Sequence, residues 1–231
     1  MSDDSKQLYR PDVSSFLEQL SKTKSVKVGA QKARLIFGLD ATASREMTWD
    51  HACHIQGEMF HSALDLGGLE IQLCYYRGYS EFKHSDWCGN EEELARFMRN
   101  VRCVGGHTQI ERILTHALGE VKSAKVKALV FVGDCMEEDP DQLCHLAGKI
   151  ALYNVPIFCF QEGNDEWARI VFRSMAEISN GAYCSFESGS AEQLSNLLKA
   201  VSVYASGGYA ALQDFNARFS KPVLLLPATI K

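Results

Sequence analysis

The chain has 231 residues, of which 46% are hydrophobic and 23% charged, the balance of an ordinary soluble globular protein. Its formal net charge of −5 argues against nucleic acid or an anionic membrane as a partner, because no basic excess attracts them. No apolar run approaches the ~18 residues that a membrane-spanning helix needs.

The cysteine pattern indicates a reducing compartment. The eight cysteines are scattered without C-x-x-C spacing, and several lie in apolar runs, where a free cysteine packs like a small hydrophobe. This favours a reduced protein over a disulfide scaffold. The N-terminus, Met1–Asp4, lacks the basic and apolar regions of a secretory signal. We therefore expect a cytoplasmic protein.

Two extensions are predicted to flank one domain. Residues 1–32 form an N-terminal extension, in which apolar residues recur at helical spacing and predict a short amphipathic helix over about 11–22. The domain itself covers 33–204. The C-terminal extension, 205–231, carries the apolar run Val223–Leu226. Such a segment either packs back on the domain or contacts another chain, so self-assembly through the tail remains open.

Within the domain, short apolar strands alternate with longer amphipathic helices. This alternation predicts an α/β fold: a doubly wound, mostly parallel sheet flanked by helices. One short strand is expected to pair antiparallel with its predecessor at the sheet edge, through a turn at Arg77–Tyr79. In chain order, we expect strands over 33–39, 69–77, 79–88, 127–133, 155–160 and 182–185, and helices over 45–65, 91–100, 109–121, 139–152, 164–180 and 190–204.

Oxygen-bearing residues follow several of these apolar or glycine-rich stretches. The first strand runs into Asp40-Ala41-Thr42-Ala43-Ser44, and two later stretches end at Thr108 and Asp134. Because the carboxyl ends of parallel strands share one edge, we expect these side chains to converge. Carboxylates and hydroxyls are hard ligands that suit Mg²⁺ or Mn²⁺ better than zinc. The predicted metal ligands are Asp40, Thr42, Ser44, Thr108 and Asp134.

These segments resemble the metal-ion-dependent adhesion site of the von Willebrand factor type A (vWA) family, a D-x-[ST]-x-S loop with a distant Thr and a distant Asp. The resemblance covers residues 33–204 and includes the order of strands and helices. It implies that the three hydroxyls bind the ion and that the two carboxylates bind it directly or through water. An open coordination position would then accept an acidic side chain from a partner protein. The short loop and cytoplasmic character are most similar to bacterial intracellular members of the tellurite-resistance type.

The chain departs from the family pattern at four places. Arg45 stands where a Met often follows the loop, and its cation could compete with a metal or contact an anionic ligand. Thr42 keeps the oxygen of its position but adds a methyl group, and His107 is inserted before Thr108. Cys135 replaces a Gly that often follows the last Asp, and the acidic run Glu137–Asp139 comes next. The run Glu137–Asp139 could repel a partner's carboxylate. It is also typical of the acidic first turn of a helix, which is how we interpret it.

These observations favour a Mg²⁺-dependent protein-interaction module, an adaptor or regulator that is not an enzyme. No G-x-x-x-x-G-K-[ST] phosphate loop and no nucleophile–base pair is visible. One alternative is a scaffold whose metal site is vestigial. Another is a Mg²⁺-dependent phosphohydrolase of the haloacid dehalogenase type, although that chemistry needs a second carboxylate where Thr42 stands. A simpler interpretation of Asp40 and Ser44 is that they cap the following helix.

Overall fold

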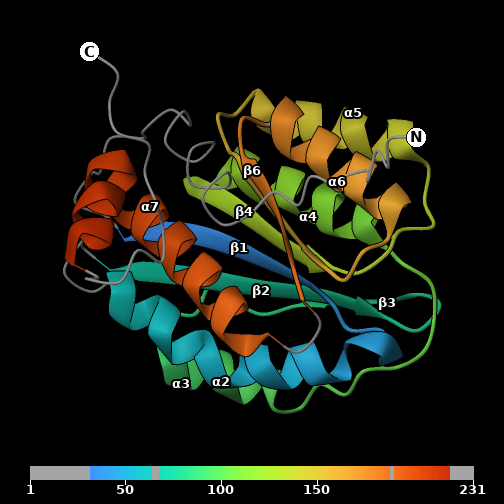
Figure 1. Ribbon diagram of the computed structural model, residues 1–231, viewed down its shortest axis with the longest axis horizontal. Helices are drawn as coiled ribbons and strands as arrows, with labels where there is room; N and C mark the ends of the chain where they lie inside the picture. The colour runs from blue at the N-terminus through green and yellow to red at the C-terminus, as the bar shows by residue number, and fades with distance from the viewer. Residues whose placement is uncertain (1–31, 64–67, 188–189, 219–231) are drawn as a thin grey trace, which may run out of the picture.

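The computed structural model describes residues 32–63, 68–187 and 190–218. A six-stranded sheet in the order β3-β2-β1-β4-β5-β6 crosses the centre of the molecule (Figure 1). All neighbouring strands are parallel except β2 and β3, which pair antiparallel at one edge. The predicted fold class is thereby confirmed. The strands are β1 (Ala33–Asp40), β2 (Leu69–Arg77), β3 (Glu81–His84), β4 (Val126–Gly133), β5 (Ile157–Glu162) and β6 (Ala182–Phe186).

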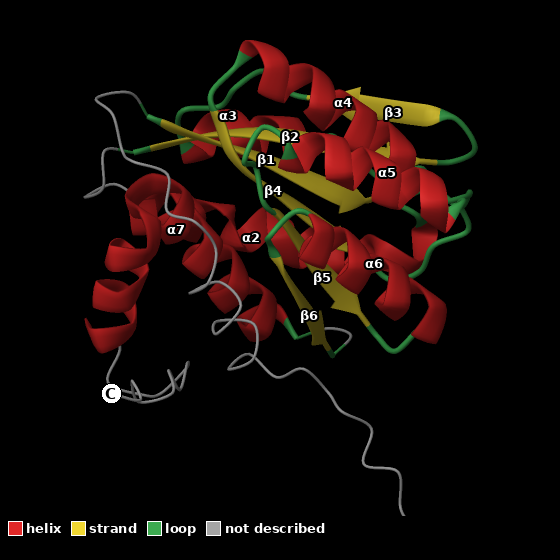
Figure 2. Ribbon diagram, turned by 90° about the horizontal axis from the view of Figure 1, so that it is seen from above, coloured by secondary structure: helices red, strands yellow, loops and turns green. Residues whose placement is uncertain are grey.

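Helices cover both faces of the sheet. Figures 1 and 2 show α4, α5 and α6 on one side and α2 and α7 on the other. The inner strands are thus enclosed on both faces, which is why they read as nearly continuous apolar runs. The helices are the short 3₁₀ turn η1 (Ala43–Arg45), α2 (Glu46–Ala63), α3 (Glu91–Met98), α4 (Ile110–Ser123), α5 (Pro140–Ala151), α6 (Glu166–Ile178) and α7 (Ala191–Arg218).

Successive side chains of β1 pack into two separate hydrophobic cores, one on each face of the sheet. Phe37 packs into the core under α2, α3 and α7, together with Trp49 and Val201. Ile36 packs into the core under α4, α5 and α6, together with Phe172. This alternation follows from the two-residue period of a strand. Because β1 lies between two filled layers, its carboxyl end has a fixed position.

Two elements differ from expectation. We expected the last helix to end near residue 204. The segment labelled α7 instead consists of two helices that together reach Arg218 and are separated by a kink at Gly208, whose φ of 69° and ψ of −164° are not helical. Strand β3 is shorter than the predicted 79–88 segment, although Cys88 still bridges to β2.

Other expectations fall partly or wholly outside the described residues. The predicted helix over 11–22 and the apolar run Val223–Leu226 are among them. All eight cysteines do lie in the described part, and each is a free thiol. None of the helices in the described ranges is both long and apolar enough to cross a membrane.

The packing of β6 against β5 gives a testable prediction at Gly181. A Cβ at this position would lie 2.0 Å from the backbone oxygen of Ile157, so Gly181→Ala must shift the backbone. We expect this variant to lose more than about 1 kcal/mol of unfolding free energy in urea titration. Gly119→Ala is the matched control, because a Cβ there meets nothing within 4 Å and helix α4 gains a better helix former. Equal stability of both variants would contradict this packing.

Candidate metal centre

The candidate site lies where the sheet changes its direction of winding. β1 pairs in parallel with β2 on one side and with β4 on the other. In open α/β sheets, ligands bind at this switch, outside the carboxyl ends of the strands. Asp40 is the last residue of β1, and Asp134 directly follows β4. Both carboxylates therefore lie at the point that the topology favours.

Asp40 is a buried carboxylate held from two sides. Only 1% of its surface is exposed. Its Oδ1 accepts a hydrogen bond from the backbone N–H of Thr42 at 2.7 Å, and its Oδ2 accepts one from the Tyr76 hydroxyl at 3.0 Å. Burial raises the pKa of Asp40, while the hydrogen bonds from Thr42 oppose that rise. The first link fixes the loop after β1, and the second fixes the carboxylate against β2.

A chain of hydrogen bonds joins this loop to Asp134. The Thr42 and Ser44 hydroxyl oxygens lie 3.2 Å apart, and the Ser44 hydroxyl donates to Asp134 Oδ2 at 2.7 Å. Four of the five predicted ligands are thus connected one to the next, although Ser44 and Asp134 are ninety residues apart in the chain.

The donor set fits a hard divalent cation. Asp134 Oδ1 is buried and has no hydrogen-bond partner. A buried acceptor without a partner is costly, and a cation would satisfy it. Among the described residues, no three His, Cys, Asp or Glu side chains gather in a metal-binding group. A metal here would therefore rest on two carboxylates and on hydroxyl oxygens, as Mg²⁺ or Mn²⁺ prefers.

Thr108, the fifth predicted ligand, is connected to the site through Glu137. The Thr108 hydroxyl accepts a hydrogen bond from the Glu137 backbone N–H at 3.0 Å, and the Thr108 N–H donates to the Glu137 carboxylate at 3.2 Å. His107 Nδ1 lies 3.0 Å from the same carboxylate. Because Glu137 follows Asp134 by three residues, these contacts hold Thr108 against the Asp134 loop.

The turn between β2 and β3 supports the Thr108 loop from its other side. The Gly78 N–H donates to the Val104 carbonyl at 3.2 Å, and the Gln109 side chain donates to the Gly78 carbonyl at 3.1 Å. A Cβ on Gly106 would lie 2.0 Å from the Gly78 oxygen, so only glycine permits this approach. Val104 N–H in turn donates to the Ala41 carbonyl at 3.1 Å. The Asp40 loop and the Thr108 loop are therefore fastened together by backbone contacts.

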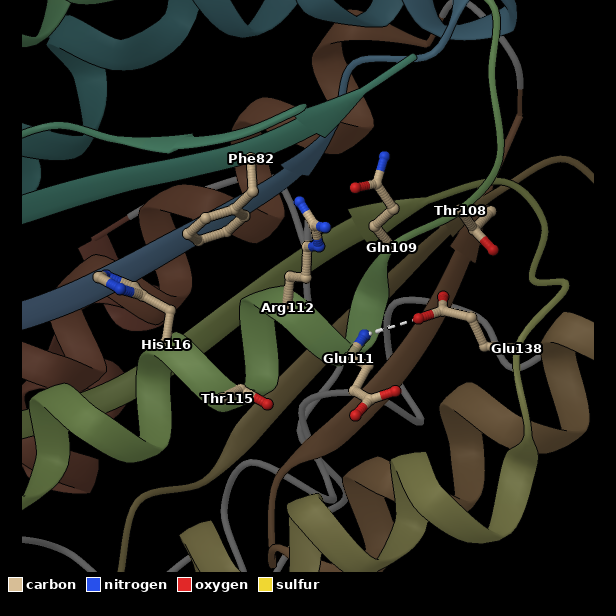
Figure 3. A pocket seen from close by; sticks show the side chains of 8 residues that line it. All are labelled: Phe82, Thr108, Gln109, Glu111, Arg112, Thr115, His116 and Glu138. Carbon is tan, nitrogen blue, oxygen red and sulfur yellow. Dashed lines mark hydrogen bonds between the residues drawn. The ribbon is translucent and has the colours of Figure 1, made fainter. Parts of the chain in front are cut away.

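Glu138 has a role that the sequence analysis missed. Its two carboxylate oxygens accept hydrogen bonds from the backbone N–H groups of Ile110 and Glu111, each at 2.8 Å, and Figure 3 shows the second of these. The prediction that the acidic run forms the first turn of the next helix is wrong for Glu137 and Glu138. The Glu138 carboxylate instead satisfies N–H groups at the start of α4, where Gln109 provides no side-chain cap, and the Glu137 carboxylate accepts from Thr108 in the loop before it.

A sequence signal did mark the true boundary. Helix α5 begins at Pro140, and the Asp139 side chain caps it by accepting from the Asp141 N–H at 2.9 Å. Proline favours the first helical position, so Asp139-Pro140 indicates a cap followed by a helix start. The two glutamates before it are then free to reach another element.

A groove of about 750 Å³ opens beside the site, between β3 and α4 (Figure 3). Within it, His116 lies 2.9 Å from the Gln72 side-chain oxygen and stacks on His84 with ring centroids 4.4 Å apart. Burial lowers the pKa of His116, and the neighbouring His84 lowers it further. The lining residues are Phe82, Thr108, Gln109, Glu111, Arg112, Thr115, His116 and Glu138.

Removing the Glu138 cap is expected to destabilise the protein. Glu138→Ala leaves two N–H groups of α4 without their carboxylate, and we expect a loss of about 1 kcal/mol in unfolding free energy, as for other helix caps. Glu138→Gln keeps one acceptor oxygen and should lose less. Urea denaturation of the three proteins measures the order. Equal stability of Glu138→Ala and wild type would contradict the capping role.

The buried imidazole of His116 predicts a pH dependence of stability. Because the folded pKa lies below the ordinary value of 6.5, the unfolded chain binds the proton more readily. The free energy of unfolding should therefore fall as the pH drops below 6.5. His116→Gln, which preserves a donor to Gln72, should show a smaller fall when denaturation is compared at about pH 7.5 and about pH 5.5. An unchanged slope would show that His116 does not contribute.

Comparison with known proteins rests on structure alone. No family model matches the chain, and no curated protein sequence matches it. Its fold is similar to the VWA domain of SpRpn10, with 14% identity and a TM-score of 0.58 over 77% of this chain and 97% of that one. It is also similar to a von Willebrand factor type A protein from Catenulispora acidiphila, with 16% identity and a TM-score of 0.57 over 77% and 43% of the two chains.

Two other solved structures also have a similar fold. Mussel byssus proximal thread matrix protein 1, solved with a zinc-occupied MIDAS motif, gives 16% identity and a TM-score of 0.59 over 78% of this chain and 50% of that one. The vWF domain of the pilus tip protein Mfa5 from Porphyromonas gingivalis gives 10% and 0.56 over 90% and 99%. At such identities the similarity establishes the fold, and the fold of this chain is that of vWA domains.

Proposed function

We propose that this protein is a protein-interaction module that binds a divalent cation, Mg²⁺ or Mn²⁺, at the edge of its vWA fold and has no catalytic role. The observation that carries the proposal is the connected set of oxygen side chains ending at Asp134, whose Oδ1 is buried without a partner. Asp40, Thr42, Ser44 and Asp134 would hold the ion, with Thr108 contributing from the adjoining loop. One neighbour of the same fold carries a metal at its MIDAS motif, which supports this assignment.

The cation would supply a positive charge and an open coordination position for an acidic side chain of a partner. Hydroxyl ligands are neutral, so the ion stays electrophilic and an incoming carboxylate gains a charge-assisted contact. The acidic run after Asp134 is a smaller obstacle than its sequence indicates. Glu137 and Glu138 are engaged with the Thr108 loop and with α4, which partly offset their charges.

Exposed apolar side chains around the site support a protein partner. Met47 is 62% exposed just after the Asp40 loop, and Tyr79 is 77% exposed in the turn that holds the Thr108 loop. Val104, also exposed at 45%, lies in that same loop. Large apolar side chains left open beside a polar centre are typical of protein-interaction surfaces. The eight free thiols are consistent with an intracellular setting, and we place the protein with the bacterial cytoplasmic members of the tellurite-resistance type.

A second candidate is a scaffold that uses the same surface without metal. The observation in its favour is Arg45, a cation buried beside the predicted ligands, whose charge competes with that of a metal ion. The two candidates differ in one measurable property, the response of the folded protein to free divalent cations.

Thermal melts with and without Mn²⁺ or Mg²⁺ test the proposal. A cation that binds only the folded state stabilises it by about 2.7 kcal/mol at 100 times its Kd, which raises Tm by several degrees in a domain of this size. Asp134→Asn should abolish the rise, while Asp141→Asn, an exposed carboxylate on α5, should retain it. No metal-dependent rise in the wild type would favour the scaffold.

An affinity capture from bacterial lysate, with Mg²⁺ and with chelator, then separates metal-dependent partners from others.

A further inference from the structure

Arg45 is a charged side chain beside the site that is not one of the five predicted metal ligands. It ends η1, directly after Ser44, and only 1% of its surface is exposed. Its Nη1 donates to the carboxylate of Glu162, the last residue of β5. Charged side chains are seldom fully buried unless they are paired, and this pair brings a fixed cation under the Asp40 loop.

The pairing with Glu162 does not account for the whole guanidinium. Arg45 Nε and Nη2 are buried and have no hydrogen-bond partner, whereas an arginine fully matched to a carboxylate uses two of its donors. Two buried acceptors at this site also have no partner, Asp134 Oδ1 and Gln109 Oε1. Donors and acceptors are thus both left incomplete in this region.

Both predicted carboxylate ligands act on the Arg45 charge. Burial lowers the pKa of the guanidinium, and the negative charges of Asp134 and Asp40 oppose that lowering. These two carboxylates are therefore within electrostatic reach of a cation that cannot leave. In a partly desolvated region such an interaction is much stronger than in water.

We infer that Arg45 sets the divalent-cation affinity of this site: its fixed positive charge lowers the affinity, and Glu162 offsets part of that effect. The inference rests on the proposed function, since it concerns the same metal site. Arg45 stabilises the two carboxylates when no metal is bound, and its charge repels a metal ion that approaches them. Arg45 and Glu162 are positioning residues here, acting on the ligands through charge.

A purely structural role for the ion pair predicts a different outcome. If Arg45 and Glu162 served only to fasten η1 to β5, removing either one would loosen the loop and weaken cation binding in the same direction. A role through charge predicts opposite directions. Arg45→Gln removes a positive charge and should strengthen binding, whereas Glu162→Gln leaves the positive charge uncompensated and should weaken it.

The experiment is calorimetric titration of the full chain with Mn²⁺ at constant ionic strength. We expect Kd to fall by about tenfold in Arg45→Gln and to rise by about tenfold in Glu162→Gln, the order of magnitude of one charge in a partly buried site. Arg45→Lys, which keeps the charge, should change Kd less than Arg45→Gln. The matched control is Arg173→Gln, which breaks the exposed ion pair with Glu177 on α6 and should leave Kd unchanged. If Arg45→Gln does not fold, as judged by circular dichroism, the double variant Arg45→Gln/Glu162→Gln carries the test, because it leaves no unpaired charge: it should bind Mn²⁺ at least as tightly as the wild type, and weaker binding overturns the inference.

The outcomes separate this inference from the proposed function. Weaker or unchanged Mn²⁺ binding in Arg45→Gln overturns the inference and leaves metal binding by the wild type intact. Binding by Arg45→Gln alone, with none by the wild type, supports the inference and overturns the metal-dependent function. If neither protein binds Mn²⁺ at millimolar concentrations, both fail.

Discussion

β1 and β4 lie side by side in parallel at the centre of the sheet, and the chain leaves their carboxyl ends toward opposite sides. That divergence opens a gap between the two loops, at the point where the strand order reverses. Asp40 and Asp134 lie on either side of the gap, and the Ser44 hydroxyl crosses it to Asp134 at 2.7 Å. The remaining features of the site act on these two loops, by fixing them or by adjusting their charge.

Hydrogen bonds from side chains, to other side chains and to the backbone, hold these two loops in position. Tyr76 holds Asp40 from the neighbouring strand, and Glu137 and Glu138 hold the Thr108 loop and the start of α4. The approach of Gly106 to Gly78 then leaves little space for that loop to shift. Ligands placed in advance lose less freedom on binding, so such contacts favour recognition of a small ion or a partner side chain. The hydrogen bonds that buried backbone groups require thus also order the site.

The sequence was informative where local pattern and burial coincide. The strands that are enclosed on both faces read as apolar runs, and residues at their ends, Asp40 and Asp134, marked the edge of the sheet. The roles of Glu137 and Glu138 could not be predicted, because their partners lie about thirty residues away and a run of acids usually belongs to the nearest helix. The burial of Arg45 was equally hidden, since a charged residue after a loop normally indicates solvent exposure.

Arg45 explains how two carboxylates can remain close together in a region with little water. Burial is the main reason that the pKa of Asp40 is raised; Asp134 raises it further, and Arg45 lowers it by a smaller amount, so the guanidinium relieves part of the repulsion between the two acids. A fixed cation provides this relief at all times, whereas an exchangeable cation provides it only when bound. The fixed charge therefore keeps the Asp40 loop folded without an ion, at the expense of affinity for one. Glu162 lies at the end of β5, the next strand but one from β1. Its negative charge partly offsets that of Arg45 and so limits the loss of cation affinity.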